Sequence, residues 1–258
     1  DHVQENLLLD HHFGAEIHYA KNNMFAGLQT AGIYLRHGNV YFIPPGGSSV
    51  LGSIGYVNAA LELKKQIDEG HLPEPDYIFC TLGSKGTLAG LMVGTRLAGM
   101  KTKVYGVRVA MEWVTDSRKT VRLANRMVAL MRKYDKNVPP IAFTMDDILV
   151  THDFFGAEYG APTPEGERAL DLVRQTEGAT LDLTYTAKTM AAMLDFIGKH
   201  PKLSDTPMLF WNTFNSVDFT DVISKDHDHT CLPGPLQWCF EENMIPCLKN
   251  SANQSPMK

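Results

Sequence analysis

The chain has 258 residues, of which 44% are hydrophobic and 21% are charged. These fractions are typical of a folded globular protein and exclude a disordered polymer. The formal net charge of −5 provides no basic excess for binding a phosphate backbone, so we expect no nucleic-acid partner. No apolar run is long enough to cross a bilayer, so we also expect no membrane partner.

The four cysteines do not form a Cys-x-x-Cys pair. Cys80 lies in an apolar run and is expected to be a buried thiol, whereas Cys231, Cys239 and Cys247 lie near the end of the chain. This pattern favours a reducing compartment such as the cytoplasm over a disulfide framework. Because the first residue is Asp1 rather than methionine, we expect a preceding segment and predict nothing about targeting.

The first fifty residues contain one predicted helical turn, at 6–9. Two short β-prone segments follow, at 15–19 and 39–43. A Pro-Pro-Gly-Gly-Ser-Ser cluster at 44–49 then breaks the chain and has helix-capping residues at its end.

From residue 56 onward, predicted helices and strands alternate. Helices are indicated by apolar residues three and four positions apart, and strands by short continuous apolar runs. The predicted helices are 56–67, 88–98, 115–134, 164–176 and 187–197, and the predicted strands are 76–82, 103–109, 147–150 and 208–211. This alternation predicts the α/β fold class, with a mostly parallel sheet flanked by helices. Beyond residue 223 the pattern ends, and we expect 224–258 to be an irregular tail.

Ligands bind parallel sheets beyond the carboxyl ends of the strands. This rule places residues 46–49, residues 83–87 and the stretch after Trp211 at one rim of the sheet, which is the candidate site. Residues 83–87, here called the glycine loop, connect a predicted strand to a predicted helix; they are Gly83, Ser84, Lys85, Gly86 and Thr87. Its glycines let backbone amides approach an anion closely, and its hydroxyls can donate hydrogen bonds. A phosphate group fits this chemistry.

The glycine loop also has interpretations other than a phosphate site. A plain strand-to-helix turn without a ligand stays open when the loop is considered alone. A Walker loop is disfavoured because Lys85 is followed by Gly86 rather than by serine or threonine. A dinucleotide fingerprint would need a third glycine and an acidic residue at the end of the next strand, where this chain has Arg108 and Val109.

Three ordered segments carry a resemblance to a known family. They are Pro-Pro-Gly-Gly-Ser-Ser-x-Leu-Gly-x-x-Gly-Tyr-Val at 44–57, Gly-Ser-x-Gly-Thr-x-Ala-Gly-Leu at 83–91 and Tyr-Thr-x-Lys-x-Met at 185–190. In order and spacing they are similar to the branch of fold type II pyridoxal-phosphate (PLP) enzymes that contains D-cysteine desulfhydrase and 1-aminocyclopropane-1-carboxylate deaminase. The tryptophan synthase β subunit has the same overall fold. The resemblance covers roughly residues 1–222.

The resemblance implies PLP as the cofactor and assigns roles to particular residues. The glycine loop, Lys85 included, matches the family's phosphate site. Tyr185 and Tyr159 match catalytic tyrosines, and Thr186 and Thr213 match cofactor-binding positions. The implied domains are a remnant of a smaller domain at 1–38 and a larger PLP-binding domain at 39–223. The full-length protein is expected to be a homodimer with a small amino acid as its substrate.

The two threonines favour one activity within the branch. The deaminases have a glutamate at the position of Thr186, and a carboxylate beside the ring nitrogen makes PLP a stronger electron sink than a hydroxyl does. Thr186 and Thr213 therefore favour α,β-elimination, as in D-cysteine desulfhydrase, with pyruvate, ammonia and sulfide as products. Deamination of 1-aminocyclopropane-1-carboxylate is the alternative. A non-catalytic small-ligand-binding domain and a plain nucleotide-binding domain are alternatives of other classes.

The sequence also departs from the family pattern. Asn212, Phe214 and Asn215 replace a histidine and two glycines, and Leu88 stands where relatives often carry histidine. The family's cofactor-binding lysine lies in an Asn-Lys-x-Arg-Lys segment, which would come before Asp1. We therefore expect the 258-residue polypeptide alone to be inactive.

Lys188 and a cluster near the end of the chain are expected to have no role in the site. Lys188 is expected to be solvated or to cap a helix. His227, Asp228 and His229 with Cys231 superficially resemble metal ligands, but their spacing is weak evidence, and we expect no metal site.

Overall fold

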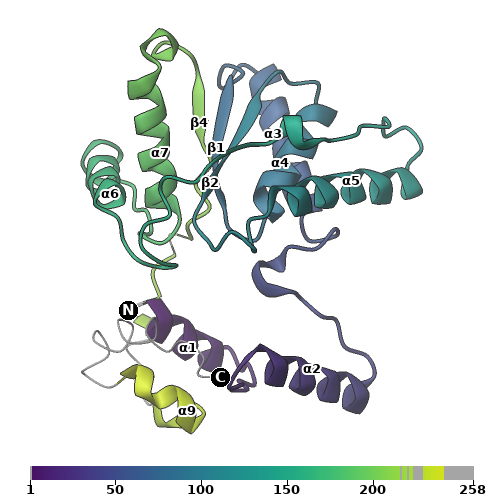
Figure 1. The fold of residues 1–258 in the computed structure, drawn as a ribbon, viewed down its shortest axis with the longest axis vertical. Coiled ribbons are helices and arrows are strands. Elements are labelled where there is room, and N and C mark those ends of the chain that lie inside the picture. Colours follow the sequence, from purple (N-terminus) through teal and green to yellow (C-terminus); the bar gives the residue numbers. More distant parts are fainter. Residues whose placement is uncertain (1, 216, 220, 223–228, 241–258) are drawn as a thin grey trace, which may run out of the picture. The chain divides into compact units, whose positions relative to one another are not determined.

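The computed structural model describes residues 2–215, 217–219, 221–222 and 229–240 (Figure 1). The chain divides into two compact units. One unit is Ile43–Asn215, and the other combines Asp1–Phe42 with Ser216–Lys258. The candidate site lies within the first unit, so the fold of that unit positions it.

A four-stranded parallel sheet forms the centre of the Ile43–Asn215 unit. Its strands are β1 (Tyr77–Leu82), β2 (Lys103–Arg108), β3 (Leu149–Thr151) and β4 (Met208–Phe210). They lie in the order β3-β2-β1-β4, and every neighbouring pair is parallel. Leu82 pairs with Arg108, so β1 and β2 end together at one edge. The predicted α/β class and parallel sheet are confirmed.

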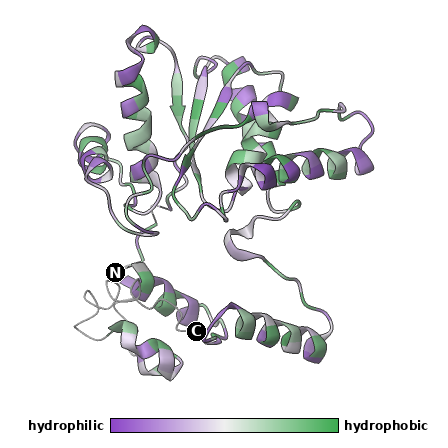
Figure 2. Ribbon diagram, in the orientation of Figure 1, coloured by the Kyte–Doolittle hydropathy of each residue, from purple (hydrophilic) through white to green (hydrophobic). Residues whose placement is uncertain are grey.

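Helices cover both faces of this sheet (Figure 1). One face carries α3 (Ile54–Asp68), α4 (Gly86–Leu97) and α5 (Ser117–Tyr134), and the other carries α6 (Pro164–Glu177) and α7 (Thr186–Lys199). α4 packs directly on β1 and β2, whereas α7 contacts β1, β2 and β4. Figure 2 shows that the strands and the inner helices are the more hydrophobic elements, as expected for parallel strands buried on both faces.

Small residues allow α3 and α4 to approach closely. A Cβ atom added to Gly94 would lie 2.5 Å from the Cβ of Ala60 and 2.7 Å from the carbonyl oxygen of Val57. Gly90 similarly faces Tyr56, where an added Cβ would lie 2.5 Å from the tyrosine Cβ. The close contact fixes α4, and therefore its first residue Gly86, relative to the 44–57 segment.

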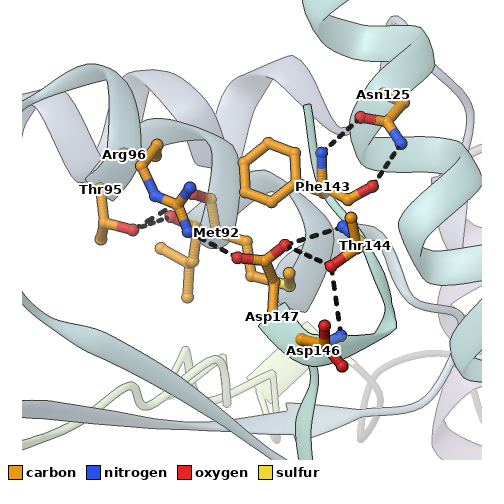
Figure 3. Close-up of polar contacts among 9 residues, drawn as sticks. Met92, Thr95, Arg96, Asn125, Phe143, Thr144, Asp146 and Asp147 are labelled. Atoms are coloured by element: carbon orange, nitrogen blue, oxygen red, sulfur yellow. Dashed lines mark hydrogen bonds and ion pairs between the residues drawn. The ribbon is translucent and has the colours of Figure 1, made fainter. Parts of the chain in front are cut away.

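Polar contacts fix the segment that enters β3 (Figure 3). Asp147 forms an ion pair with Arg96 of α4 at 2.7 Å and accepts a hydrogen bond from the backbone N–H of Thr144. Asn125 of α5 exchanges hydrogen bonds with the backbone of Phe143 at 2.8 and 2.9 Å. Asp147, the first residue of the predicted strand at 147–150, therefore ends a 3-10 turn, Met145–Asp147, and the strand begins at Leu149.

The other unit contains α1 (His2–His12), α2 (Asn23–His37) and α9 (Gly234–Gln237).

The two units also contain short 3-10 turns. Those in the Ile43–Asn215 unit are η1 (Pro45–Gly47), η2 (Met145–Asp147) and η3 (Pro201–Leu203), and those in the other unit are η4 (His229–Cys231) and η5 (Trp238–Phe240). Within the described part of the chain, no helix has the length and apolar character needed to span a membrane.

The predicted β-prone segments at 15–19 and 39–43 are wrong, because both are irregular. A strand requires a neighbouring strand to satisfy its backbone groups, and the described residues offer neither segment such a partner. Tyr41 and Ile43 are instead 71% and 69% exposed. The assignment of residues 1–38, 39–223 and 224–258 to separate domains stays a prediction.

Cys80 in β1 is fully buried among apolar side chains. Burial raises the pKa of its thiol to about 12. We expect Cys80 to resist alkylation between pH 7 and pH 9 in native protein and to react once urea unfolds the chain, because the thiolate is the reactive form. Peptide mapping by mass spectrometry measures this. Rapid labelling of Cys80 in native protein would contradict the buried position of β1.

Candidate functional site

A cavity of about 690 Å³ opens at the carboxyl edge of the sheet. This volume suits a cofactor-sized ligand. The cavity is lined by Pro45, Gly46 and Ser48, by four glycine-loop residues, by residues between 110 and 119, and by Tyr159, Tyr185 and Thr213. The predicted common rim, with 46–49, the glycine loop and the stretch after Trp211, is confirmed.

The glycine loop joins the end of β1 to the start of α4. The N–H of Gly86 donates a hydrogen bond of 3.1 Å to Ser48 Oγ, and Ser48 Oγ donates one of 2.6 Å to Ser84 Oγ. A Cβ atom added to Gly86 would lie 2.6 Å from Ser48 Oγ and 3.0 Å from Ser53 Oγ, so glycine is required there. Hydroxyl groups and backbone amides thus gather at the N-terminus of α4.

The residues present fit a phosphate group. The N-terminus of α4 supplies positive potential, and Ser84 and Thr87 line the cavity with hydroxyls. Ser53, near Gly86, is only 1% exposed, and its buried hydroxyl has no hydrogen-bond partner among the described residues. A buried polar atom without a partner is rare, so the Ser53 hydroxyl, which lies behind the cavity wall, has donor capacity left for a water.

Two lysines add positive charge to the same cavity. The ammonium of Lys85 donates to the carbonyl oxygen of Val114, and that of Lys119 donates to the carbonyl oxygen of Trp113 at 3.1 Å. Burial lowers the pKa of Lys85, the neighbouring Lys119 lowers it further, and Asp116 opposes both effects. The two lysines therefore connect the glycine loop to the wall formed by residues 110–119.

Tyr159 and Tyr185 place their hydroxyl groups in contact with each other. The backbone N–H of Tyr185 donates to Asp182 Oδ1 at 2.7 Å, which fixes the start of α7. Burial raises the pKa of Tyr185 well above its usual value, and the Tyr159 hydrogen bond and the Asp182 charge raise it further. At neutral pH the phenol is therefore protonated and can donate a hydrogen bond.

Thr213 lines the cavity, but Thr186 does not. Thr186 is 1% exposed, and its hydroxyl donates a 2.7 Å hydrogen bond to Asp182 Oδ2. This hydroxyl completes the turn before α7, so the structure does not support the predicted cofactor contact of Thr186. Gly86 does not line the cavity either, and its backbone N–H donates a hydrogen bond to Ser48.

Ser48, Trp113 and Lys119 line the cavity without having been assigned a role from the sequence. The Gly-Gly-Ser-Ser run placed Ser48 near the rim, yet only the packed structure shows its hydroxyl on Gly86. Lys119 lies on an amphipathic helix, where a lysine ordinarily indicates a solvated face. His227 and Asp228, considered above as metal ligands, lie outside the described residues.

Lys85 has φ = +81°, and it is the only non-glycine residue in the described ranges with a positive φ. A side chain in this region costs about 1 kcal/mol. We expect Lys85→Gly to be more stable than Lys85→Ala by about 1 kcal/mol. Both variants lose the bond to Val114, so that bond does not contribute to their difference in stability. Urea unfolding measures it, and equal stabilities would contradict the left-handed conformation.

Comparisons with known proteins agree with this geometry. Residues 1–211 match the family described as "Pyridoxal-phosphate dependent enzyme". A D-cysteine desulfhydrase from Serratia proteamaculans (strain 568) is 34% identical over 173 residues, which are 67% of this chain and 49% of that protein. A second, from Klebsiella pneumoniae (strain 342), is 36% identical over the same shares. The chain thus spans about half the length of these curated relatives.

A solved structure described as "Crystal Structure Analysis of the ACC deaminase homologue" is also similar. It has a TM-score of 0.64 and 27% identity, and the match covers 84% of this chain and 65% of that one. The family match extends over most of the chain and includes the glycine loop, both tyrosines and the 110–119 wall. On this ground, the chain belongs to the family of pyridoxal-phosphate dependent enzymes.

Proposed function

We propose that the full-length protein catalyses α,β-elimination on a small amino acid, as D-cysteine desulfhydrase does, and releases pyruvate, ammonia and sulfide. The observation that carries this proposal is the shared cavity: the Tyr159–Tyr185 phenol pair faces the same space as the glycine loop and Thr213. The named desulfhydrase relatives support the choice of reaction.

The glycine loop would hold the phosphate of PLP through its amides and through the hydroxyls of Ser84 and Thr87. Ser48 donates a hydrogen bond to Ser84 and accepts one from the N–H of Gly86, so it would hold the loop in place. Lys85 and Lys119 would offset part of the phosphate charge across the cavity. When bound, PLP acts as an electron sink for bonds to the substrate α carbon.

The phenol pair would supply the proton that the leaving group needs. Because the pKa of Tyr185 is raised by burial and by Tyr159, the hydroxyl keeps its proton at neutral pH. Tyr185 would hold this proton toward a departing sulfur atom, and Tyr159 would orient the hydroxyl by the hydrogen bond that they share. Met111 and Trp113 would add apolar surface to the wall of this cavity.

Thr213 supports elimination over ring opening. It brings a hydroxyl to the cavity, and a hydroxyl does not hold a proton on a ring nitrogen as a carboxylate does. The position after Tyr185, where the deaminases carry glutamate, is Thr186, which is turned to Asp182. Deamination of 1-aminocyclopropane-1-carboxylate is kept as the second candidate because of the solved deaminase homologue.

An assay of the full-length, PLP-loaded protein tests the proposal. D-cysteine should yield sulfide, pyruvate and ammonia in equal amounts, and 1-aminocyclopropane-1-carboxylate should be turned over more slowly. Faster turnover of the cyclopropane substrate would favour the deaminase instead. No turnover of either by PLP-loaded protein, with both substrates binding, would favour a non-catalytic binding domain.

Two proposals concern the organisation of the whole protein. We propose that it is a homodimer, which light scattering on the full-length protein tests, since a monomeric mass would contradict it. We also propose that residues 39–223 belong to the PLP-binding domain and residues 1–38 to a smaller one. Limited proteolysis tests this division, because the chain should be cut first near residue 38. A first cut within residues 39–223 would contradict it.

A further inference from the structure

Lys188 on α7 is completely buried, with 0% of its surface exposed. The expectation that it is solvated or caps a helix is therefore wrong. Its ammonium donates a 2.7 Å hydrogen bond to the carbonyl oxygen of Phe155. Among the residues that the structure describes, no carboxylate lies within ion-pair distance of this ammonium. Burying an ammonium without a carboxylate partner costs free energy, so the presence of a lysine at this position needs an explanation.

The loop after β3 is built around this lysine. The ammonium lies 5.8 Å from the centre of the Phe155 ring, and Arg108 lies 4.4 Å from the same ring. Gly156 has φ = +84°, and a Cβ atom there would lie 2.8 Å from Thr163 Cγ2 and 3.7 Å from the lysine ammonium. Thr163 in turn caps α6. The lysine side chain thus fills the space between α7 and the segment 155–166.

The same two segments also carry the phenol pair. Tyr185 directly precedes α7 and lies three residues, about one helical turn, before Lys188. Tyr159 lies four residues after Phe155 in the loop. The bond from Lys188 to Phe155 and the contact between the two phenols are therefore two connections between α7 and one loop. Tyr159 is 49% exposed and has little packing of its own to hold it in place.

We propose that Lys188 is a positioning residue for the phenol pair. Its ammonium anchors the loop at Phe155, and the anchored loop places the Tyr159 hydroxyl on that of Tyr185. This role rests on the proposed function only where turnover is concerned, because the geometry can be tested without it. Methionine at position 188 would keep the length of the side chain and lose the hydrogen bond to the loop.

The first test measures the titration of Tyr185 by NMR of full-length protein labelled at tyrosine Cζ. Tyr185→Phe assigns the signal. The titratable groups that face Tyr185 are Tyr159 and Asp182, and burial is the largest cause of its raised pKa. Lys188→Met should let Tyr185 titrate at a lower pH than in the parent. The reason is that the loop no longer holds Tyr159 against Tyr185, and the hydrogen bond that raises the pKa of Tyr185 is lost. Lys199→Met, on the exposed end of the same helix, should leave the titration unchanged.

The second test separates positioning from simple stabilisation. Lys188→Met should lower turnover by about tenfold to a hundredfold. In a Tyr159→Phe background, the same change should lower turnover no further. The unfolding midpoint of each variant, measured in parallel, separates this result from a change in stability. Equal losses of turnover in both backgrounds would overturn the proposal, and so would an unchanged Tyr185 titration in Lys188→Met.

A second variant keeps the proposal testable if Lys188→Met does not fold. Gly156→Ala strains the loop beside the anchor without changing α7, so it should shift the Tyr185 titration in the same direction. An unchanged titration in this variant would overturn the proposal. If the titrations respond but the parent protein releases no sulfide, the proposed function fails and the positioning role stands. If sulfide is released and the titrations do not respond, only the positioning role fails.

Discussion

Replacing Tyr185 with phenylalanine should lower turnover of D-cysteine by the full-length protein by about a hundredfold or more. The change removes the hydroxyl that holds the proton and leaves the ring that packs at the start of α7. The N–H of Tyr185 still bonds to Asp182, because that bond is made by the backbone. PLP should remain bound, because the glycine loop is untouched. Steady-state kinetics and the cofactor absorbance measure these two quantities together.

Tyr134→Phe is the matched control for this prediction. Tyr134 ends α5, is 81% exposed and does not line the cavity. The same loss of a hydroxyl there should leave turnover and PLP content at parent values. Retention of more than half of the parent turnover by Tyr185→Phe would contradict the assigned role of the phenol.

Replacing Thr87 with valine should weaken PLP binding by about tenfold to a hundredfold, as expected for losing a hydrogen bond to a charged group. Valine keeps the shape of threonine and removes only the hydroxyl. Pyridoxal, which lacks the phosphate, should bind the parent and the variant equally. Calorimetric titration of the full-length apoprotein with both compounds measures the difference.

Thr95→Val on the same helix serves as the control. The Thr95 hydroxyl donates to the carbonyl oxygen of Leu91 at 2.8 Å and does not line the cavity. Its loss should leave both affinities unchanged. A Thr87→Val variant that loses affinity for pyridoxal as much as for PLP would show that Thr87 does not contact the phosphate.

The parallel strands and the rim of the site were predictable because each depends on a local signal. A continuous apolar run such as that around Cys80 indicates a strand buried on both faces, and a glycine-rich turn after it indicates an anion site. Parallel packing then brings the turns after several strands to one edge. For this reason residues 46–49, the glycine loop and the stretch after Trp211 could be placed together before their contacts were known.

The sequence-based expectations that the structure does not support have a common physical cause. The local sequence does not determine which distant group a side chain or a backbone segment contacts. The Thr186 hydroxyl was expected to contact the cofactor, but in the structure it donates its hydrogen bond to Asp182. The sequence around Lys188 is that of an ordinary helix lysine, and only the structure shows that its ammonium is buried against the loop at Phe155. The β-prone segments at 15–19 and 39–43 had suitable residues but no neighbouring strand among the described residues.

The central claim is that the glycine loop binds the phosphate of PLP, with Thr213 and the phenol pair around the rest of the cofactor. A crystal structure of the PLP-loaded full-length protein tests it most directly. The phosphate oxygens should lie within about 3 Å of the loop amides and of the Thr87 hydroxyl, with Tyr185 beside the ring. A phosphate bound elsewhere, or a ring far from Tyr185 and Thr213, would contradict the account.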